Sequence, residues 1–131
     1  MWDEIAIVDD NKFDRLICRR IVEKMREVGK SVEFDSSNQL LSYLSSQKAE
    51  KKGLLIFLDI NMPGINGLDL LKKLNEDEEF KDLVERLSIF IMTSSTLTQE
   101  IESARSYSLA DGIIPKPMSI KKVTDIMMNA Y

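Results

Sequence analysis

The chain contains 131 residues with a formal net charge of −4, 44% apolar residues, one cysteine and no histidine. We expect one domain over residues 1–131, and the acidic balance argues against nucleic acid or an anionic membrane as a partner. The single cysteine, Cys18, excludes an intrachain disulfide. The acidic start at Met1–Glu4 is unlike a signal peptide, and no apolar run approaches the length of a membrane span. We therefore expect a cytoplasmic protein, which cannot use an imidazole of its own as a base, a zinc ligand or a phosphate carrier.

The first apolar run, Ile5–Val8, predicts a buried strand that ends at Asp9 and Asp10. Asn11 then predicts the cap of a helix that ends at Gly29, and Asp14 three residues later gives a near capping box. The residues expected on the buried face of this helix repeat every four positions: Phe13, Ile17, Ile21 and Met25. Basic residues are expected to form its solvated face: Arg15, Arg19, Arg20, Lys24 and Arg26.

The next strand and helix have a weaker pattern. Ser31–Phe34 is interrupted by polar residues, which is typical of an edge strand. A second helix is predicted over about Asn38–Lys48, with Ser36 or Ser37 as its cap. Its inward residues are predicted to be Leu40, Leu41 and Leu44.

The third strand, Leu54–Leu58, consists of five apolar residues in a row and is predicted to be buried on both faces. Asp59 follows it directly, and the turn at Pro63–Gly64 comes too soon for a helix. Gly67–Leu74 predicts the third helix, and the acidic segment Asn75–Arg86 predicts an extra helical turn.

The last part of the chain repeats the same alternation. Leu87–Met92 predicts the fourth strand, which Thr93-Ser94-Ser95 follows, and a fourth helix is expected from Thr98 to about Ser108. Ile113–Ile114 predicts a very short fifth strand before Pro115. Ser119 is expected to cap a last helix with four inward residues: Ile120, Val123, Ile126 and Met127.

This alternation predicts an α/β fold: a three-layer, doubly wound, five-stranded parallel sheet with helices on both faces. The first, third and fourth strands are continuously apolar and belong at the centre, whereas the second and fifth belong at the edges. Pro115 fits an edge strand, because proline has no N–H to donate to a neighbour. The expected strand order is 2-1-3-4-5, the flavodoxin-like order.

Polar residues follow four of the predicted strands at their carboxyl ends, where such sheets bind ligands. They are Asp9 and Asp10 after the first strand, Asp59 after the third, Thr93 after the fourth and Lys116 after the fifth. Three neighbouring carboxylates repel one another unless a cation joins them, and Mg²⁺ is the hard divalent ion that such oxygen ligands suit. The lysine and the hydroxyl would then donate to a phosphoryl group.

These residues lie in motifs that resemble those of a response-regulator receiver domain over the whole chain. The matching motifs are Val8-Asp9-Asp10, Leu58–Gly64 with Gly67, Ile91–Ser94 and Lys116-Pro117. The resemblance implies that Asp59 accepts a phosphoryl group from a phosphohistidine on a sensor histidine kinase or a histidine phosphotransfer protein. It implies that the Asp10 and Asp59 side chains and the Asn61 carbonyl bind Mg²⁺, with Asp9 reaching the ion through water. Thr93 and Lys116 would hold the phosphoryl oxygens, and an unknown downstream protein would read the signal.

Two positions depart from the family pattern. Receivers usually carry a tyrosine or phenylalanine three residues before the lysine, where this chain has Ile113, and Pro115 stiffens the strand directly before Lys116. The resemblance also predicts a cis peptide bond between Lys116 and Pro117.

Three other functions compete with a phosphoacceptor that catalyses only its own phosphorylation and slow dephosphorylation. A haloacid-dehalogenase-like phosphatase needs a second aspartate two residues after its nucleophile, and Asn61 cannot serve as that acid. A pseudo-receiver without phosphate turnover would usually have lost an acid, the lysine or the hydroxyl, and all are present. A flavin carrier is disfavoured because Asp9 and Asp10 would repel the flavin phosphate.

Overall fold

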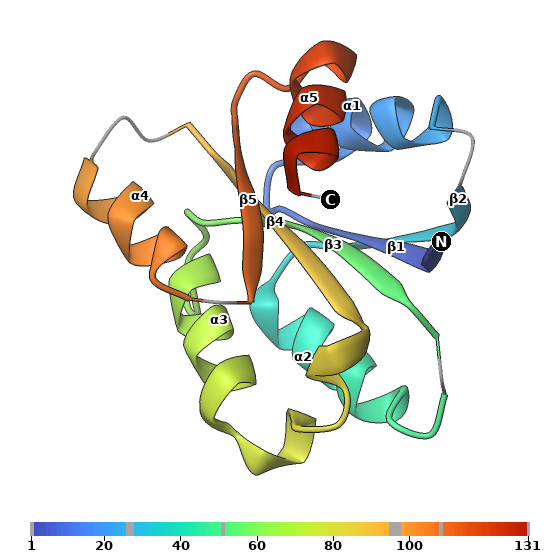
Figure 1. Ribbon diagram of the computed structural model, residues 1–131, viewed down its shortest axis with the longest axis vertical. Coiled ribbons are helices and arrows are strands. Elements are labelled where there is room, and N and C mark those ends of the chain that lie inside the picture. Colours follow the sequence, from blue (N-terminus) through green and yellow to red (C-terminus); the bar gives the residue numbers. More distant parts are fainter. Residues whose placement is uncertain (1, 26–27, 51, 95–97, 108, 131) are drawn as a thin grey trace.

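Five parallel strands form one sheet in the order β2-β1-β3-β4-β5, as the sequence predicts (Figure 1). The computed structural model describes residues 2–25, 28–50, 52–94, 98–107 and 109–130. The strands are β1 (Trp2–Val8), β2 (Val28–Phe34), β3 (Leu54–Asp59), β4 (Leu87–Thr93) and β5 (Ala110–Pro115). The helices are α1 (Lys12–Glu23), α2 (Ser37–Ser46), α3 (Gly67–Glu76), α4 (Thr98–Arg105) and α5 (Ile120–Ala130).

Alternate side chains of the central strands enter two separate apolar layers. On one face, Ala6 and Val8 of β1 pack in a cluster with leucines of α2 and α3 and with Ala104 of α4. On the other face, Ile5 and Ile7 pack with residues of α1 and α5. Figure 1 shows α1 and α5 together on one side of the sheet and α2 and α3 on the other. All six residues of β3 are buried, since β3 has a strand on each side and helices on both faces.

The buried face of α1 differs from the prediction. Phe13 is 75% exposed and Ile17 is 42% exposed, whereas Cys18 and Val22 are buried with the predicted Ile21. A four-residue spacing advances by about 40° around a helix at each step, so residues four apart do not stay on one face over three turns. The helix also ends at Glu23, and Gly29 lies in β2 rather than at a helix end.

Two arginines of α1 do more than form a solvated face. The Arg15 guanidinium donates to the Asp9 carbonyl at 2.7 Å and lies 3.5 Å from Glu33 of β2. Arg19 pairs with the same Glu33 at 3.0 Å. These contacts attach α1 to the edge strand, while Arg26 lies outside the described residues.

The predicted helix caps are confirmed. The Asn11 side chain accepts from the N–H groups of Phe13 and Asp14, and Ser36 caps α2 through the Gln39 N–H. Ser119 accepts from the Lys122 N–H at the start of α5. Of the inward residues predicted for α5, Val123 and Met127 are buried, but Ile120 is 44% exposed.

The fifth strand is longer than the two residues predicted. It begins at Ala110, and its Asp111 carboxylate accepts from the Ile89 N–H at 2.9 Å beside a register irregularity in β4. Gly112 fits closely there, because a Cβ would lie 3.0 Å from the side chains of Phe90 and Ile126, which would have to shift slightly. The helix α4 ends at Arg105. Ser108, near which this helix was predicted to end, lies outside the described residues, as does Ser95.

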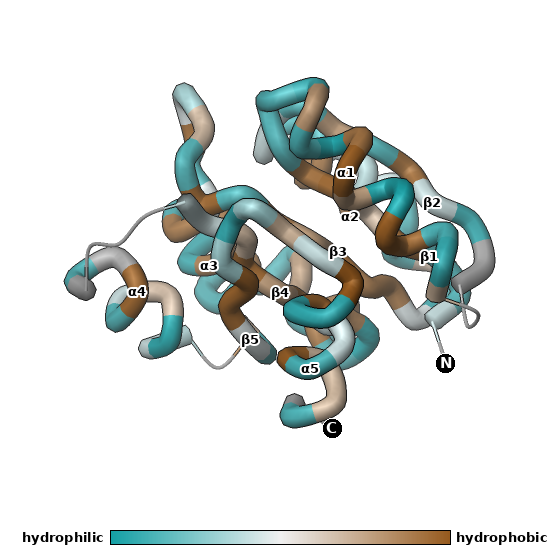
Figure 2. The backbone as a smooth tube through the Cα atoms, turned by 90° about the horizontal axis from the view of Figure 1, so that it is seen from above, coloured by the Kyte–Doolittle hydropathy of each residue, from teal (hydrophilic) through white to brown (hydrophobic). Residues whose placement is uncertain are grey.

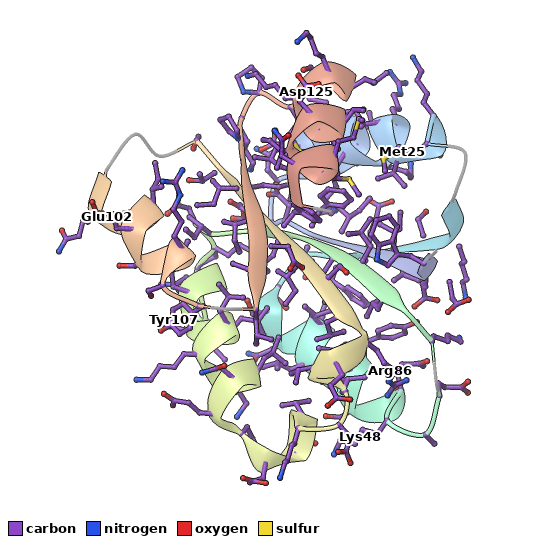
Figure 3. The ribbon with its side chains drawn as sticks, in the orientation of Figure 1. Met25, Lys48, Arg86, Glu102, Tyr107 and Asp125 are labelled. Carbon is purple, nitrogen blue, oxygen red and sulfur yellow. The ribbon has the colours of Figure 1, made fainter. Side chains whose placement is uncertain are left out.

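The acidic segment between α3 and β4 contains two short 3₁₀ helices, η1 (Glu78–Phe80) and η2 (Val84–Arg86), in place of one extra turn. At this end of the molecule Arg86 lies beside Lys48 (Figure 3) and donates to its carbonyl at 3.3 Å. Lys48 also pairs with Glu79 at 2.8 Å. These contacts attach the segment to the end of α2. Figure 2 shows α4 and β2 on opposite sides of the molecule. None of the helices in the described residues is long and apolar enough to span a bilayer.

Candidate functional site

The predicted site residues lie together at the carboxyl-terminal edge of the sheet, where the parallel strands end, because each of them ends a strand or follows one. The end of β1 is level with the end of β3, since Val8 pairs in register with Leu58. Asp59 is level with Met92, and Thr93 with Pro115. Asp9, Asp59, Thr93 and Lys116 are thereby brought to adjacent strand ends, as predicted for the crevice of a doubly wound sheet.

Three carboxylates meet at this edge. One oxygen each of Asp9, Asp10 and Asp59 lies within 4.8 Å of the others, with Asp9 and Asp59 buried and Asp10 exposed. Backbone N–H groups fix two of them: Asn11 donates to Asp9 at 2.9 Å, and Asn61 donates to Asp59 at 3.2 Å. Oxygen ligands at this spacing fit a hard divalent cation such as Mg²⁺.

The Asp59 carboxyl is harder to ionise than an ordinary aspartate. Burial and the neighbouring charge of Asp9 raise its pKa from 3.8 to about 7, although Lys116 and the Asn61 N–H act in the opposite direction. A divalent cation between these groups would relieve the repulsion and favour the ionised form. The electrostatics of the site thus favour cation binding.

Lys116 lies among the carboxylates. Its ammonium is 2.8 Å from Asp9 and 3.6 Å from Asp59, and its side chain is 13% exposed. Burial disfavours its charge, but the carboxylates around it outweigh that effect and raise the pKa of Lys116 above its ordinary value. The lysine is therefore a fixed positive charge at neutral pH.

The backbone around Lys116 is held by β4. The Lys116 N–H donates to the Thr93 carbonyl at 2.8 Å, and Thr93 itself is 2% exposed. The peptide bond between Lys116 and Pro117 is cis, which confirms the prediction. The lysine and the threonine are thus joined through the main chain.

Gly67 allows α3 to begin close to Asp59. A Cβ at Gly67 would lie 2.7 Å from the Asp59 carbonyl oxygen and 2.8 Å from the Ile60 Cα, both backbone atoms. The Gly67 N–H donates to the Ile60 carbonyl at 3.0 Å, and Asn66 caps the helix through the Asp69 N–H. A larger residue would displace the backbone that carries Asp59.

One residue at this edge was not predicted as part of the site. Asp14 lies in the first turn of α1, and its carboxylate is 2.9 Å from the Lys116 ammonium. The expected capping box is only half formed, because the Asn11 N–H is bound by Asp9 and not by Asp14. An acid one helical turn after the Asp9-Asp10 pair was the available signal, but it does not reveal the direction of the side chain.

The sequence model of the response regulator receiver domain matches residues 5–128. The chain belongs to this family. It is 34% identical over 119 residues to the chemotaxis protein CheY-3 of Vibrio cholerae, covering 88% of this chain and 82% of that protein. It is 29% identical over 136 residues to the two-component response regulator ARR6 of Arabidopsis thaliana, covering 95% and 68% respectively.

A solved structure has the same fold. The two-component response regulator from Cytophaga hutchinsonii matches with a TM-score of 0.84 at 21% identity, covering 98% of this chain and 96% of that one. Receiver domains are signalling domains rather than classical enzymes, and they interact with histidine kinases or phosphotransfer proteins. A metal typically binds at their acidic cluster, which corresponds here to Asp9, Asp10 and Asp59.

Proposed function

We propose that Asp59 of this receiver domain accepts a phosphoryl group from a phosphohistidine of a partner histidine kinase or phosphotransfer protein. An Asp59 oxygen forms a bond to phosphorus while the bond from phosphorus to the imidazole nitrogen breaks, which leaves an acyl phosphate and a free imidazole. The absence of histidine from the chain agrees with a donor imidazole supplied by the partner. The observation that carries the proposal is the buried Asp59 carboxyl between a second buried acid and a fixed lysine.

The residues around Asp59 have separate roles in this proposal. Asp10, Asp59 and the Asn61 carbonyl would hold Mg²⁺, with Asp9 reaching it through water. Mg²⁺ would supply positive charge that offsets the carboxylates and the phosphoryl oxygens. Lys116 and Thr93 would hold the phosphoryl oxygens after transfer. We also propose a cytoplasmic location and a protein target, with neither nucleic acid nor a membrane as partner, as the sequence predicts.

Intact-mass spectrometry after incubation with acetyl phosphate tests the acceptor. The wild-type chain should gain one phosphoryl group in the presence of Mg²⁺ and none in EDTA, and Asp59→Asn should gain none. Asp10→Asn should label more slowly, whereas Asp82→Asn, which removes an exposed acid after η1, should label as wild type. Equal labelling of Asp59→Asn and wild type would contradict the assignment of the acceptor.

The same samples separate the competing functions. A phosphatase of the haloacid-dehalogenase type would release phosphate steadily from p-nitrophenyl phosphate, far beyond one equivalent per chain. A pseudo-receiver would not label under any of these conditions. A phosphoacceptor should label once per chain and release phosphate only as slowly as its own acyl phosphate hydrolyses.

We further propose that phosphorylation rearranges the face of α4, β5 and α5 only slightly. Ile113 is half-buried against the apolar layer that contains Ala104, and it lines a cavity of about 320 Å³ with Arg105 and Ile126. Its β-branched side chain is stiff and has no polar tip, so it has little reason to exchange between exposed and buried positions. Amide chemical shifts with and without beryllofluoride and Mg²⁺ test this. Large shifts at Ile113 and along α4 would contradict it, whereas shifts confined to the loops around Asp59 and Thr93 would support it.

A further inference from the structure

Three carboxylates of the described residues lie within 4 Å of the Lys116 ammonium, and two of them are within hydrogen-bonding distance. It donates to Asp9 at 2.8 Å and to Asp14 at 2.9 Å, while the Asp59 oxygen lies 3.6 Å away. The two shorter distances are those of charge-assisted hydrogen bonds, whereas 3.6 Å is too long for one. Lys116 is thus hydrogen-bonded to Asp9 and Asp14, whereas it lies near Asp59, the proposed phosphoryl acceptor, without a hydrogen bond to it.

Asp14 is well placed to compete for this lysine. Its backbone N–H is held by the Asn11 side chain, so the first turn of α1 fixes where the carboxylate starts. The neighbouring Arg15 is already bound to the Asp9 carbonyl and paired with Glu33. Within the described part of the chain, the one ion pair that Asp14 makes is with Lys116.

The two short contacts differ in their access to water. The Asp9 side chain is fully buried, whereas the Asp14 side chain is 34% exposed. A carboxylate that loses its partner is rehydrated more readily at the exposed position. If the lysine moves toward Asp59, the contact with Asp14 is therefore the one that breaks.

We propose that Asp14 is a positioning residue that holds Lys116 back from Asp59 and so weakens occupation of the phosphoryl site. The inference rests on the proposed function, since it requires a phosphoryl group at Asp59. An ammonium has three N–H donors, and the Asp14 carboxylate competes with the phosphoryl oxygens for one of them. Removing the acid leaves that donor available to the phosphoryl group.

Calorimetric titration with beryllofluoride in excess Mg²⁺ tests the proposal on the whole chain. Asp14→Asn, which keeps the shape of the side chain, should bind this phosphoryl mimic about threefold more tightly than wild type, as expected for the loss of a partly exposed ion pair. Asp14→Glu, which keeps the charge within reach of the lysine, should bind within about twofold of wild type. Asp35→Asn is the matched control, because Asp35 follows β2 at the same sheet edge, is exposed and makes no contact with Lys116.

The outcomes separate this inference from the proposed function. If wild type does not bind the mimic, the proposed function fails. If wild type binds, then equal or weaker binding by Asp14→Asn overturns the inference. An equal gain in Asp35→Asn also overturns it, because the effect would then reflect net charge and not the position of the lysine. Thermal unfolding of each variant verifies that it is folded, and Asp14→Gln replaces Asp14→Asn if the latter is not.

Discussion

Replacing Asp59 with asparagine removes a charge that the folded chain holds at a cost. Asp59 is 4% exposed, and burial and the charge of Asp9 raise its pKa from 3.8 to about 7. At about 1.4 kcal/mol per pH unit, this difference in pKa means that the ionised Asp59 carboxylate destabilises the folded state by at most roughly 4 kcal/mol. The neighbouring Asp10 is exposed, so solvent screens part of the repulsion, and we take about 2 kcal/mol as the expected destabilisation. Asparagine keeps an oxygen for the Asn61 N–H, so the variant should be more stable by about 2 kcal/mol at alkaline pH.

The expected difference in unfolding free energy between Asp59→Asn and wild type depends on pH. The folded state binds this proton more tightly than the unfolded state, so the stability due to protonation is present near pH 4 and is lost as the pH rises through about 7. The difference in unfolding free energy between Asp59→Asn and wild type should therefore be small at about pH 4 and reach its maximum at about pH 8. Urea denaturation in EDTA at several pH values measures it. Adding Mg²⁺ should stabilise wild type and narrow the gap, because a cation offsets the same repulsion. A difference that does not vary with pH, or a variant that is less stable at alkaline pH, would refute the reasoning.

Three further changes test the packing of the fold. Gly67→Ala should lower stability by about 1–3 kcal/mol, because its Cβ meets backbone atoms at 2.7 Å. Gly64→Ala, at a φ of +78° with nothing within 4 Å, should cost about 1 kcal/mol; the opposite ranking in urea would contradict this. Tyr43→Phe should lower the unfolding free energy by about 1–3 kcal/mol, because Glu4, only 3% exposed, loses its hydroxyl donor, and an unchanged urea midpoint would contradict this. The Cys18 thiol is buried and its pKa is raised, so it should react with a thiol reagent only after unfolding; rapid reaction in the native protein would show that α1 opens locally.

The sheet could be predicted because its strands carry strong local patterns. Leu54–Leu58 is apolar at every position since β3 is buried on both faces, and the alternation of strands and helices then allows few topologies. The residues at the strand ends followed from the same reasoning. Asp59 ends β3 and Lys116 follows β5, with β4 alone between these strands in the sheet, so the proximity of the two residues follows largely from the topology. The extent of the domain over residues 1–131 stays a prediction.

The remaining features depend on tertiary contacts that no local pattern encodes. Phe13 and Ile17 are as apolar as the buried residues of α1, and their exposure follows from the drift of a four-residue spacing around the helix together with the rotation of the helix against the sheet. The start of β5 was missed because Asp111 and Gly112 are poor strand formers. They lie in the strand because one binds the Ile89 N–H and the other leaves room for Phe90.

The contact between Asp14 and Lys116 is the clearest omission. The two residues are 102 positions apart, and their distance is determined by where the packing of α1 places its first turn relative to Lys116. A sequence pattern can place an acid in the first turn of a helix, but the direction of its carboxylate follows from the packing of that helix. Prediction therefore reached the residues on the strands and missed the one on a helix.

The order of the strands also bears on how the chain folds. β1 and β3 are neighbours, so Asp9 and Asp59 come together as soon as these two strands pair. Lys116 arrives only with β5, whose one neighbour among the described strands is β4. The first four strands paired without β5 would thus gather the acids at their carboxyl ends without the lysine, and the repulsion between the carboxylates would oppose that arrangement. Docking of β5 supplies the missing positive charge, so the pairing of this strand and the assembly of the site are coupled through Lys116.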